Sequence, residues 1–245
     1  MLLDWLLAQL QFDQPGLWLL ISLLAGGLGY AVLVLRPALR ERLPWLTALR
    51  ALGIPYVGLL VGGLSPRRMG LSEIDWLASV GWGVGLILAL LGFLLLLRPT
   101  LTGLGGAGRE ERAPFPVVQA GLREFHWAFL RGSLWGIFAA LGALPIANGL
   151  NGINGINGLI DSMATQPAYW AVWTAAAIAL VEILLAANLA STDFEADRPA
   201  LIVGFFTLLA TSVLFLYTRN FWLCWLLHAG IVLAIAGQRP RSTAE

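Results

Sequence analysis

The chain has 245 residues, of which 58% are hydrophobic and only 12% are charged. Soluble domains carry about 25% charged residues, so this composition argues against one large soluble core and indicates a membrane protein. The formal net charge is +1, which gives no reason to expect a nucleic-acid partner. All 15 basic residues are arginines, so no lysine can form a Schiff base or serve as a general base.

Apolar segments recur along the chain, and several reach the length of about 20 residues that a helix needs to cross a bilayer. A short amphipathic piece, Leu2 to Phe12, comes first. The stretch 44–64 holds Arg50 and Pro55, so it either spans the membrane or is re-entrant. We expect an all-α, polytopic transmembrane bundle of about seven spans, near 17–35, 44–64, 75–97, 117–147, 168–190, 199–217 and 221–237.

The arginines predict the orientation of this bundle. With the N-terminus outside, twelve arginines fall on the cytoplasmic side, and only Arg67, Arg68 and Arg219 fall outside. Cytoplasmic loops carry the excess of arginine in membrane proteins. We therefore expect an integral protein of a bacterial cytoplasmic membrane, with its N-terminus outside and its C-terminus inside. The pair Arg67–Arg68 is the part of this topology that fits the rule least well.

A triplet of asparagine, glycine and an apolar residue repeats four times over residues 148–159. Asparagine and glycine both tolerate positive φ angles, which favours successive turns. The repeat therefore predicts a loop on the non-cytoplasmic side.

Ionisable side chains enter the predicted span at 117–147. Glu124 and Arg131 are seven residues apart and share one helix face, whereas His126 lies on another side. An isolated ionisable group in hydrocarbon costs roughly 2.5–3.5 kcal/mol on insertion scales, so such groups usually face a protein interior or a water-filled cavity. The alternative is that they anchor the helix at the cytoplasmic interface.

Three further polar residues lie within the later spans: Glu182, Asn188 and His228. Each needs a partner at membrane depth, which indicates one interior polar site. The alternative is a structural hydrogen-bond network between helices. We expect no cofactor, because two histidines and one cysteine without an H-E-x-x-H pair do not form a conventional zinc motif. A divalent metal such as zinc, held by His126, His228 and a carboxylate, is an alternative that no spacing requires.

The stretch from Thr211 to Val232 reads T-S-V-L-F-L-Y-T-R-N-F-W-L-C-W-L-L-H-A-G-I-V. It resembles the C-terminal signature of the CPBP family, which comprises the CAAX prenyl endopeptidases of the second type and the bacteriocin-processing or Abi membrane proteins. The segment Pro66 to Leu71 resembles the family's upstream R-x-G-L connection. The resemblance implies a CPBP-like core at 66–237, after an N-terminal transmembrane extension at 1–65 and before a cytoplasmic tail at 238–245.

The family's motifs can be placed on this chain residue by residue. Arg131 matches the end of the first motif, E-E-x-x-x-R, and the two Glu positions hold His126 and Trp127. Asn188 stands where the motif F-x-x-x-H has its histidine. His228 matches the histidine of the third motif, and Val232 replaces the asparagine that usually follows it.

The resemblance also implies roles. In the family the first glutamate is thought to activate water, helped by two histidines, while an asparagine stabilises the oxyanion. Here His126 would be the base and Asn188 the oxyanion donor beside His228, with Glu124 or Glu182 as a carboxylate from a different position. All of these would line one cytoplasm-facing cavity.

Two functions therefore compete. The first is an intramembrane endopeptidase that cuts a membrane-associated peptide, protein or prenylated tail. The second is a catalytically inactive homologue that works as a scaffold, chaperone or accessory subunit of a membrane complex. In both cases the lipid bilayer is the immediate partner.

Overall fold

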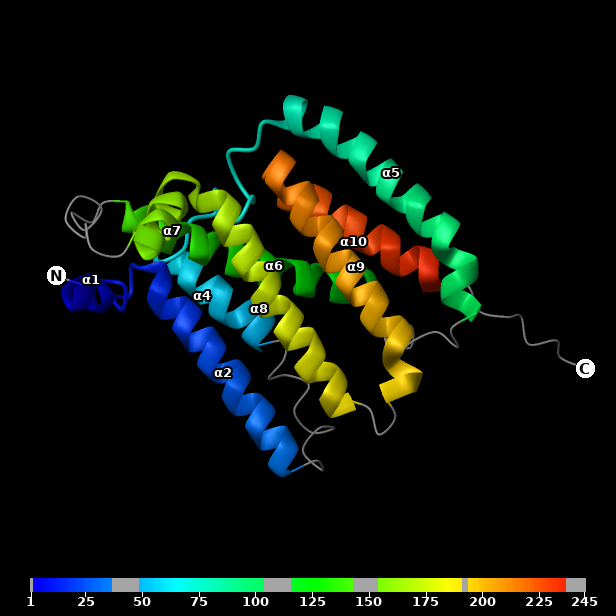
Figure 1. Cartoon of the computed structure of the whole chain (residues 1–245), viewed down its shortest axis with the longest axis horizontal. Coiled ribbons are helices and arrows are strands. Elements are labelled where there is room, and N and C mark those ends of the chain that lie inside the picture. Colours follow the sequence, from blue (N-terminus) through cyan, green and yellow to red (C-terminus); the bar gives the residue numbers. More distant parts are fainter. Residues whose placement is uncertain (1, 37–48, 104–115, 143–153, 191–193, 237–245) are drawn as a thin grey trace, which may run out of the picture.

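A computed structural model of the chain describes residues 2–36, 49–103, 116–142, 154–190 and 194–236, and these form helices without a β-strand (Figure 1). The elements are α1 (Leu2–Ala8), α2 (Pro15–Leu35), the π-helical turn η2 (Leu49–Gly53), α4 (Ile54–Leu60), α5 (Trp76–Gly103), α6 (Pro116–Leu141), α7 (Asn154–Thr165), α8 (Pro167–Ala190), α9 (Phe194–Thr218) and α10 (Phe221–Ala236).

Within the described residues, four helical stretches are long and apolar enough to cross a membrane: Pro15–Leu35, Trp76–Leu96, Pro167–Asn188 and Ala200–Thr218. They confirm the prediction of a helical integral membrane protein. The stretches Leu49–Leu60 and Phe221–Ala234 are apolar but shorter.

Several helices begin where the sequence provides a suitable first turn. Proline needs no backbone donor there, and Pro15 occupies this position in α2. The side-chain oxygen of Asn220 accepts hydrogen bonds from the backbone N–H groups of Trp222 and Leu223, at 2.9 and 3.3 Å. This cap fixes the sharp reversal between α9 and α10.

Helix α6 is the centre of the bundle and contacts α2, η2, α8 and α10. In Figure 1 it runs behind α8. Ala128, Phe129 and Leu130 have no exposed surface, and the charged Arg131 beside them is 2% exposed. Neighbouring helices therefore surround this part of α6, and its side chains Glu124 and Arg131 are covered by protein.

The outer helices carry the apolar surface that a bilayer would cover. On α5, Leu77 is 90% exposed and Leu96 is 80% exposed. On α2, Leu28 is 67% exposed. Exposed leucines at this density suit lipid contact and not water.

The described part of the stretch 44–64 is a short helix. Together η2 and α4 cover Leu49–Leu60, which is less than the roughly 20 residues of a full span. The chain then turns at Gly62, whose φ is 81°, and Leu64 packs into the same apolar cluster as Trp18 near the start of α2. Residues 44–48 lie outside the described part of the chain.

The prediction of a loop at 148–159 is wrong for its second half, because α7 begins at Asn154. Residues 148–153 lie outside the described residues. The apolar residues Ile156, Leu159, Ile160 and Met163 recur at helical spacing, which gives this segment one apolar face. That periodicity outweighs the turn preference of the Asn-Gly pairs.

Candidate functional site

Glu124 and Arg131 form an ion pair inside the bundle. The pairing follows from their spacing of two helical turns on one face of α6. The Arg131 guanidinium also donates to the carbonyl oxygens of Trp127 at 3.2 Å and Thr211 at 3.4 Å. Its Cζ lies 4.5 Å from the ring centroid of Phe215. Helix α9 therefore holds the guanidinium from the side opposite α6.

His228 of α10 completes this group, with its Nδ1 3.4 Å from Oε2 of Glu124. Its ring stacks on Trp127, with centroids 5.2 Å apart and planes 18° apart. The side chains of His228 and Glu124 are 2% and 0% exposed. We name Glu124, Arg131 and His228 the Glu124 cluster.

A second group of the same composition, Arg50, His126 and Glu182, lies on the other side of α6. Nε2 of His126 lies 3.0 Å from Oε2 of Glu182 and 3.3 Å from Nη2 of Arg50, and Arg50 forms an ion pair with Glu182. Nε of Arg50 also donates to the carbonyl of Ser22 at 3.2 Å. We name these three residues the Arg50 cluster.

The Arg50 cluster joins four elements: α2, η2, α6 and α8. Gly26 lets the guanidinium approach α2, since a Cβ at that position would lie 2.8 Å from Cζ of Arg50. Nδ1 of His126 is buried and has no hydrogen-bond partner within the described residues. The side chains of Arg50 and Glu182 are 24% and 20% exposed, so the protein covers this cluster only in part.

Asn188 lies in neither cluster. Its side-chain amide donates to the hydroxyl of Tyr30 at 3.4 Å, at an exposed contact between α8 and α2. The predicted site residues are therefore distributed over three separate contacts: Glu124 and Arg131 with His228, His126 with Glu182, and Asn188 with Tyr30.

Arg50 was not among the site residues predicted from the sequence. The signal was present, because Arg50 is an isolated charge within the apolar stretch 44–64. Like Glu182, Arg50 is a charge at membrane depth and therefore needs a partner.

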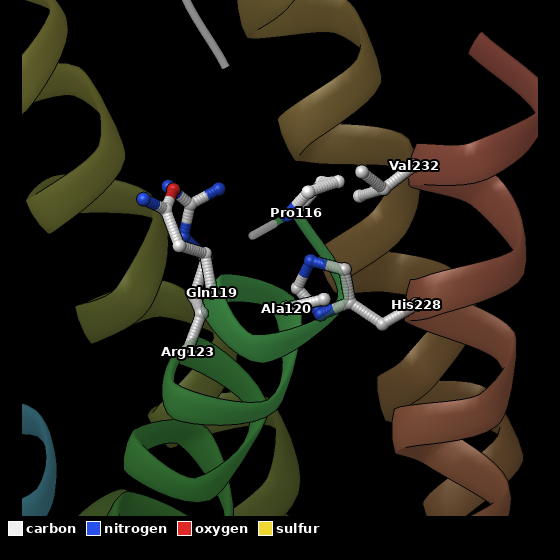
Figure 2. Close-up of a pocket in the computed structure, with 6 residues that line it drawn as sticks. All are labelled: Pro116, Gln119, Ala120, Arg123, His228 and Val232. Carbon is white, nitrogen blue, oxygen red and sulfur yellow. The ribbon is translucent and has the colours of Figure 1, made fainter. Parts of the chain in front are cut away.

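A small hollow leads to the ring of His228, between the first turns of α6 and the end of α10 (Figure 2). It has room for about one water molecule. The residues that line it are Pro116, Gln119, Ala120, Arg123, His228 and Val232. The Val232 side chain offers no hydrogen-bond donor at the position where the CPBP motif has asparagine. The Gln119 amide and the Arg123 guanidinium lie in the same lining.

Within the described ranges, no three side chains of His, Cys, Asp or Glu come together to hold a metal ion. Each cluster combines one imidazole, one carboxylate and one arginine. A zinc site normally needs at least three protein ligands, and the arginine would repel the cation.

The chain was also compared with known proteins. No protein-family model, curated protein or solved structure matches it.

Proposed function

We propose that this chain is an intramembrane endopeptidase that cuts a membrane-associated peptide or protein, with the Glu124 cluster as its active site. One observation carries the proposal: Glu124 has no exposed surface, and it faces the His228 ring that lines the hollow. A buried carboxylate behind an imidazole that water can reach is the arrangement of a general base and its orienting partner.

The roles follow from the positions. His228 touches the hollow, so it accepts the proton of a water molecule there and is the catalytic residue. Glu124 is a positioning residue, because its carboxylate fixes the orientation of His228 and stabilises the imidazolium that forms. Arg131 forms an ion pair with Glu124, and Trp127 stacks on the His228 ring and fixes its plane. Gln119 is placed to donate a hydrogen bond to the developing oxyanion.

The resemblance to the CPBP family supports this proposal on two positions: Arg131 and His228. The carboxylate comes from Glu124, two residues before His126, which occupies the first Glu position of the motif. We propose that Glu124 replaces the missing glutamates, since its side chain reaches both Arg131 and His228.

The packing of the loop Ser65–Leu71 supports seven crossings. A Cβ at Gly136 would lie 2.7 Å from Cγ of Pro15 and 2.9 Å from Nη1 of Arg68, so this loop and the start of α2 meet at one point of α6. The chain has thus returned to the side where α2 begins. We propose that this side is outside the bacterial cytoplasmic membrane and that the C-terminus is inside, as the arginine distribution favours.

The second candidate is an inactive homologue that serves as a scaffold. The bonds of Arg131 favour it, because this guanidinium is bound at once by Glu124, Trp127 and Thr211. A buried polar network in which every member is satisfied also fixes the packing of helices without any reaction.

The two candidates differ in the peptides they produce. The full chain is expressed in a bacterial host, and new N-termini in the membrane fraction are identified by mass spectrometry. We expect wild type to produce N-termini that Glu124→Gln does not, since an amide in this position drops the rate of related triads by about 10⁴. Glu73→Gln, in an exposed ion pair, is the matched control and should behave as wild type. Identical N-termini from wild type and Glu124→Gln would favour the scaffold.

A further inference from the structure

The three arginines predicted to lie outside, Arg67, Arg68 and Arg219, are gathered at one end of the bundle. The backbone N–H of Phe221 donates to the carbonyl of Gly70 at 2.9 Å. This bond ties the loop that carries Arg67 and Arg68 to the turn that carries Arg219. Figure 1 shows both segments at the end of the bundle where α5 begins.

Arg68 and Arg219 approach adjacent residues of α6. Cζ of Arg219 lies 5.0 Å from the ring centroid of Trp135, and Nη1 of Arg68 would be 2.9 Å from a Cβ at Gly136. Arg67 has a carboxylate partner, Glu73, at 3.2 Å. Among the ion pairs of the described residues, none includes Arg68 or Arg219. Two cations thus lie against neighbouring positions of α6, and no ion pair of the described residues neutralises either of them.

The backbone at Arg219 gives a second, independent observation. Its φ is 47°, in the left-handed region that glycine or asparagine adopts with less strain. The position nevertheless holds an exposed arginine between the end of α9 and the Asn220 cap. Strain retained under a charged, exposed side chain points to a role for that side chain.

Exposed aromatic residues mark the depth of this end of the bundle. Trp76 is 52% exposed, Tyr217 is 77% exposed and Trp222 is 42% exposed, and all three lie where helices begin or end beside Arg219. Tryptophan and tyrosine concentrate at the level of lipid headgroups. These aromatic residues therefore indicate that this end of the bundle lies at the level of the lipid headgroups.

We propose that Arg68 and Arg219 form a binding site for the phosphate group of an anionic lipid headgroup, on the side of the membrane where α2 begins. Guanidinium groups bind phosphate oxygens through paired, charge-assisted hydrogen bonds. Trp135 lies beneath the Arg219 guanidinium and limits its movement. This site uses no residue of the Glu124 cluster and does not depend on the proposed activity.

The test is binding of lipid to the purified full-length protein in detergent, followed by native mass spectrometry. The probes are phosphatidylglycerol, phosphatidylcholine and inorganic phosphate. We expect wild type to bind phosphatidylglycerol more tightly than phosphatidylcholine. Arg68→Gln and Arg219→Asn should each weaken the binding of phosphatidylglycerol about tenfold, the effect of losing one charge-assisted hydrogen bond. Arg67→Gln, which removes the same charge from the same loop, should change it by about twofold or less.

Arg219→Asn separates loss of binding from loss of folding. Asparagine suits the left-handed backbone, so the melting temperature of this variant should be no lower than that of wild type. Displacement of the lipid by inorganic phosphate from wild type, but not from the variants, would show that the ligand is a soluble phosphate compound and would overturn the headgroup as ligand. Failure of inorganic phosphate to displace the lipid would support the headgroup. Unchanged affinity in both Arg68→Gln and Arg219→Asn would overturn the site. An equal loss in Arg67→Gln would overturn it too, since general charge would then explain the binding.

Discussion

The Glu124 cluster and the Arg50 cluster contain the same three side-chain types, and both are anchored on α6, through residues only two positions apart. They differ in burial. In the Glu124 cluster, Arg131 and Glu124 are 3% and 0% exposed, whereas Arg50 and Glu182 in the other cluster are 24% and 20% exposed. One helix therefore carries the same chemistry in a fully buried setting and in a partly exposed setting.

The difference in burial implies a difference in role. A fully buried charge has no alternative partner, so the geometry of the Glu124 cluster is fixed and its electrostatic interactions are strong. The protein covers the Arg50 cluster only in part, so its geometry is less tightly fixed. The cluster suits a clamp that holds η2 and α2 against α6 and α8.

The largest expected effect is at Arg131. Arg131→Met leaves Glu124 buried beside His228 alone, and we expect a loss of about 3–5 kcal/mol in the free energy of unfolding. Denaturant titration in detergent micelles measures it. The double variant Glu124→Leu/Arg131→Met should recover part of the loss, because it leaves no unpaired charge. A free energy of unfolding for Arg131→Met within about 1 kcal/mol of wild type would contradict complete burial of the pair.

Arg50→Met should cost less, about 1–2 kcal/mol, between the values of exposed and buried ion pairs. The reason is that the Glu182 carboxylate is partly exposed and keeps His126 as a partner after the change. A double-mutant cycle with Glu182→Gln isolates the coupling between the two side chains. A loss equal to that of Arg131→Met would remove the contrast between the two clusters.

Variants of the two histidines distinguish a role in cleavage from a role in packing. His228→Phe keeps an aromatic ring against Trp127 and removes one hydrogen bond, so we expect about 1 kcal/mol of destabilisation and no cleavage. His126→Phe should destabilise by a similar amount and leave the cleavage products unchanged. Both are checked by thermal melting and by the N-terminal analysis. Cleavage by His228→Phe would exclude it as the base.

The smallest effect is expected at Asn188. Its contact with Tyr30 is exposed, so Asn188→Ala should change stability by less than about 0.5 kcal/mol. The same variant should produce the same new N-termini as wild type. Loss of those N-termini would restore the oxyanion role that the family resemblance implies for Asn188.

Much of the fold could be predicted from the sequence, because long apolar segments and proline or asparagine at helix starts act locally. That Glu124 and Arg131 share one face of a helix also followed from their spacing, although their ion pair was not predicted. Helix α7 was missed in part, since the Asn-Gly pairs concealed the apolar spacing that includes Ile156 and Ile160. The sequence could not decide whether the stretch 44–64 spans the membrane or is re-entrant, because composition does not fix where a chain turns.

The partners across helices could not be predicted. Which of Glu124 and Glu182 faces His228 depends on the rotation of α6, α8 and α10 about their axes. That rotation is set by the packing of residues such as Trp127 and Phe215, and no local pattern reports it. The motif match therefore pointed to His126 and Trp127 as the positions of the glutamates, whereas the carboxylate beside His228 belongs to Glu124.

The most direct test of the central claim compares Glu124→Gln with Glu182→Gln, the same change in the two clusters. Both variants are expressed as full chains, checked for folding by thermal melting, and assayed for new N-termini in the membrane fraction. If the Glu124–His228 pair is the active site, Glu124→Gln should produce no new N-termini and Glu182→Gln should produce the same new N-termini as wild type. If a folded Glu124→Gln produces the wild-type N-termini, or if only Glu182→Gln loses them, the Glu124–His228 pair is not the active site.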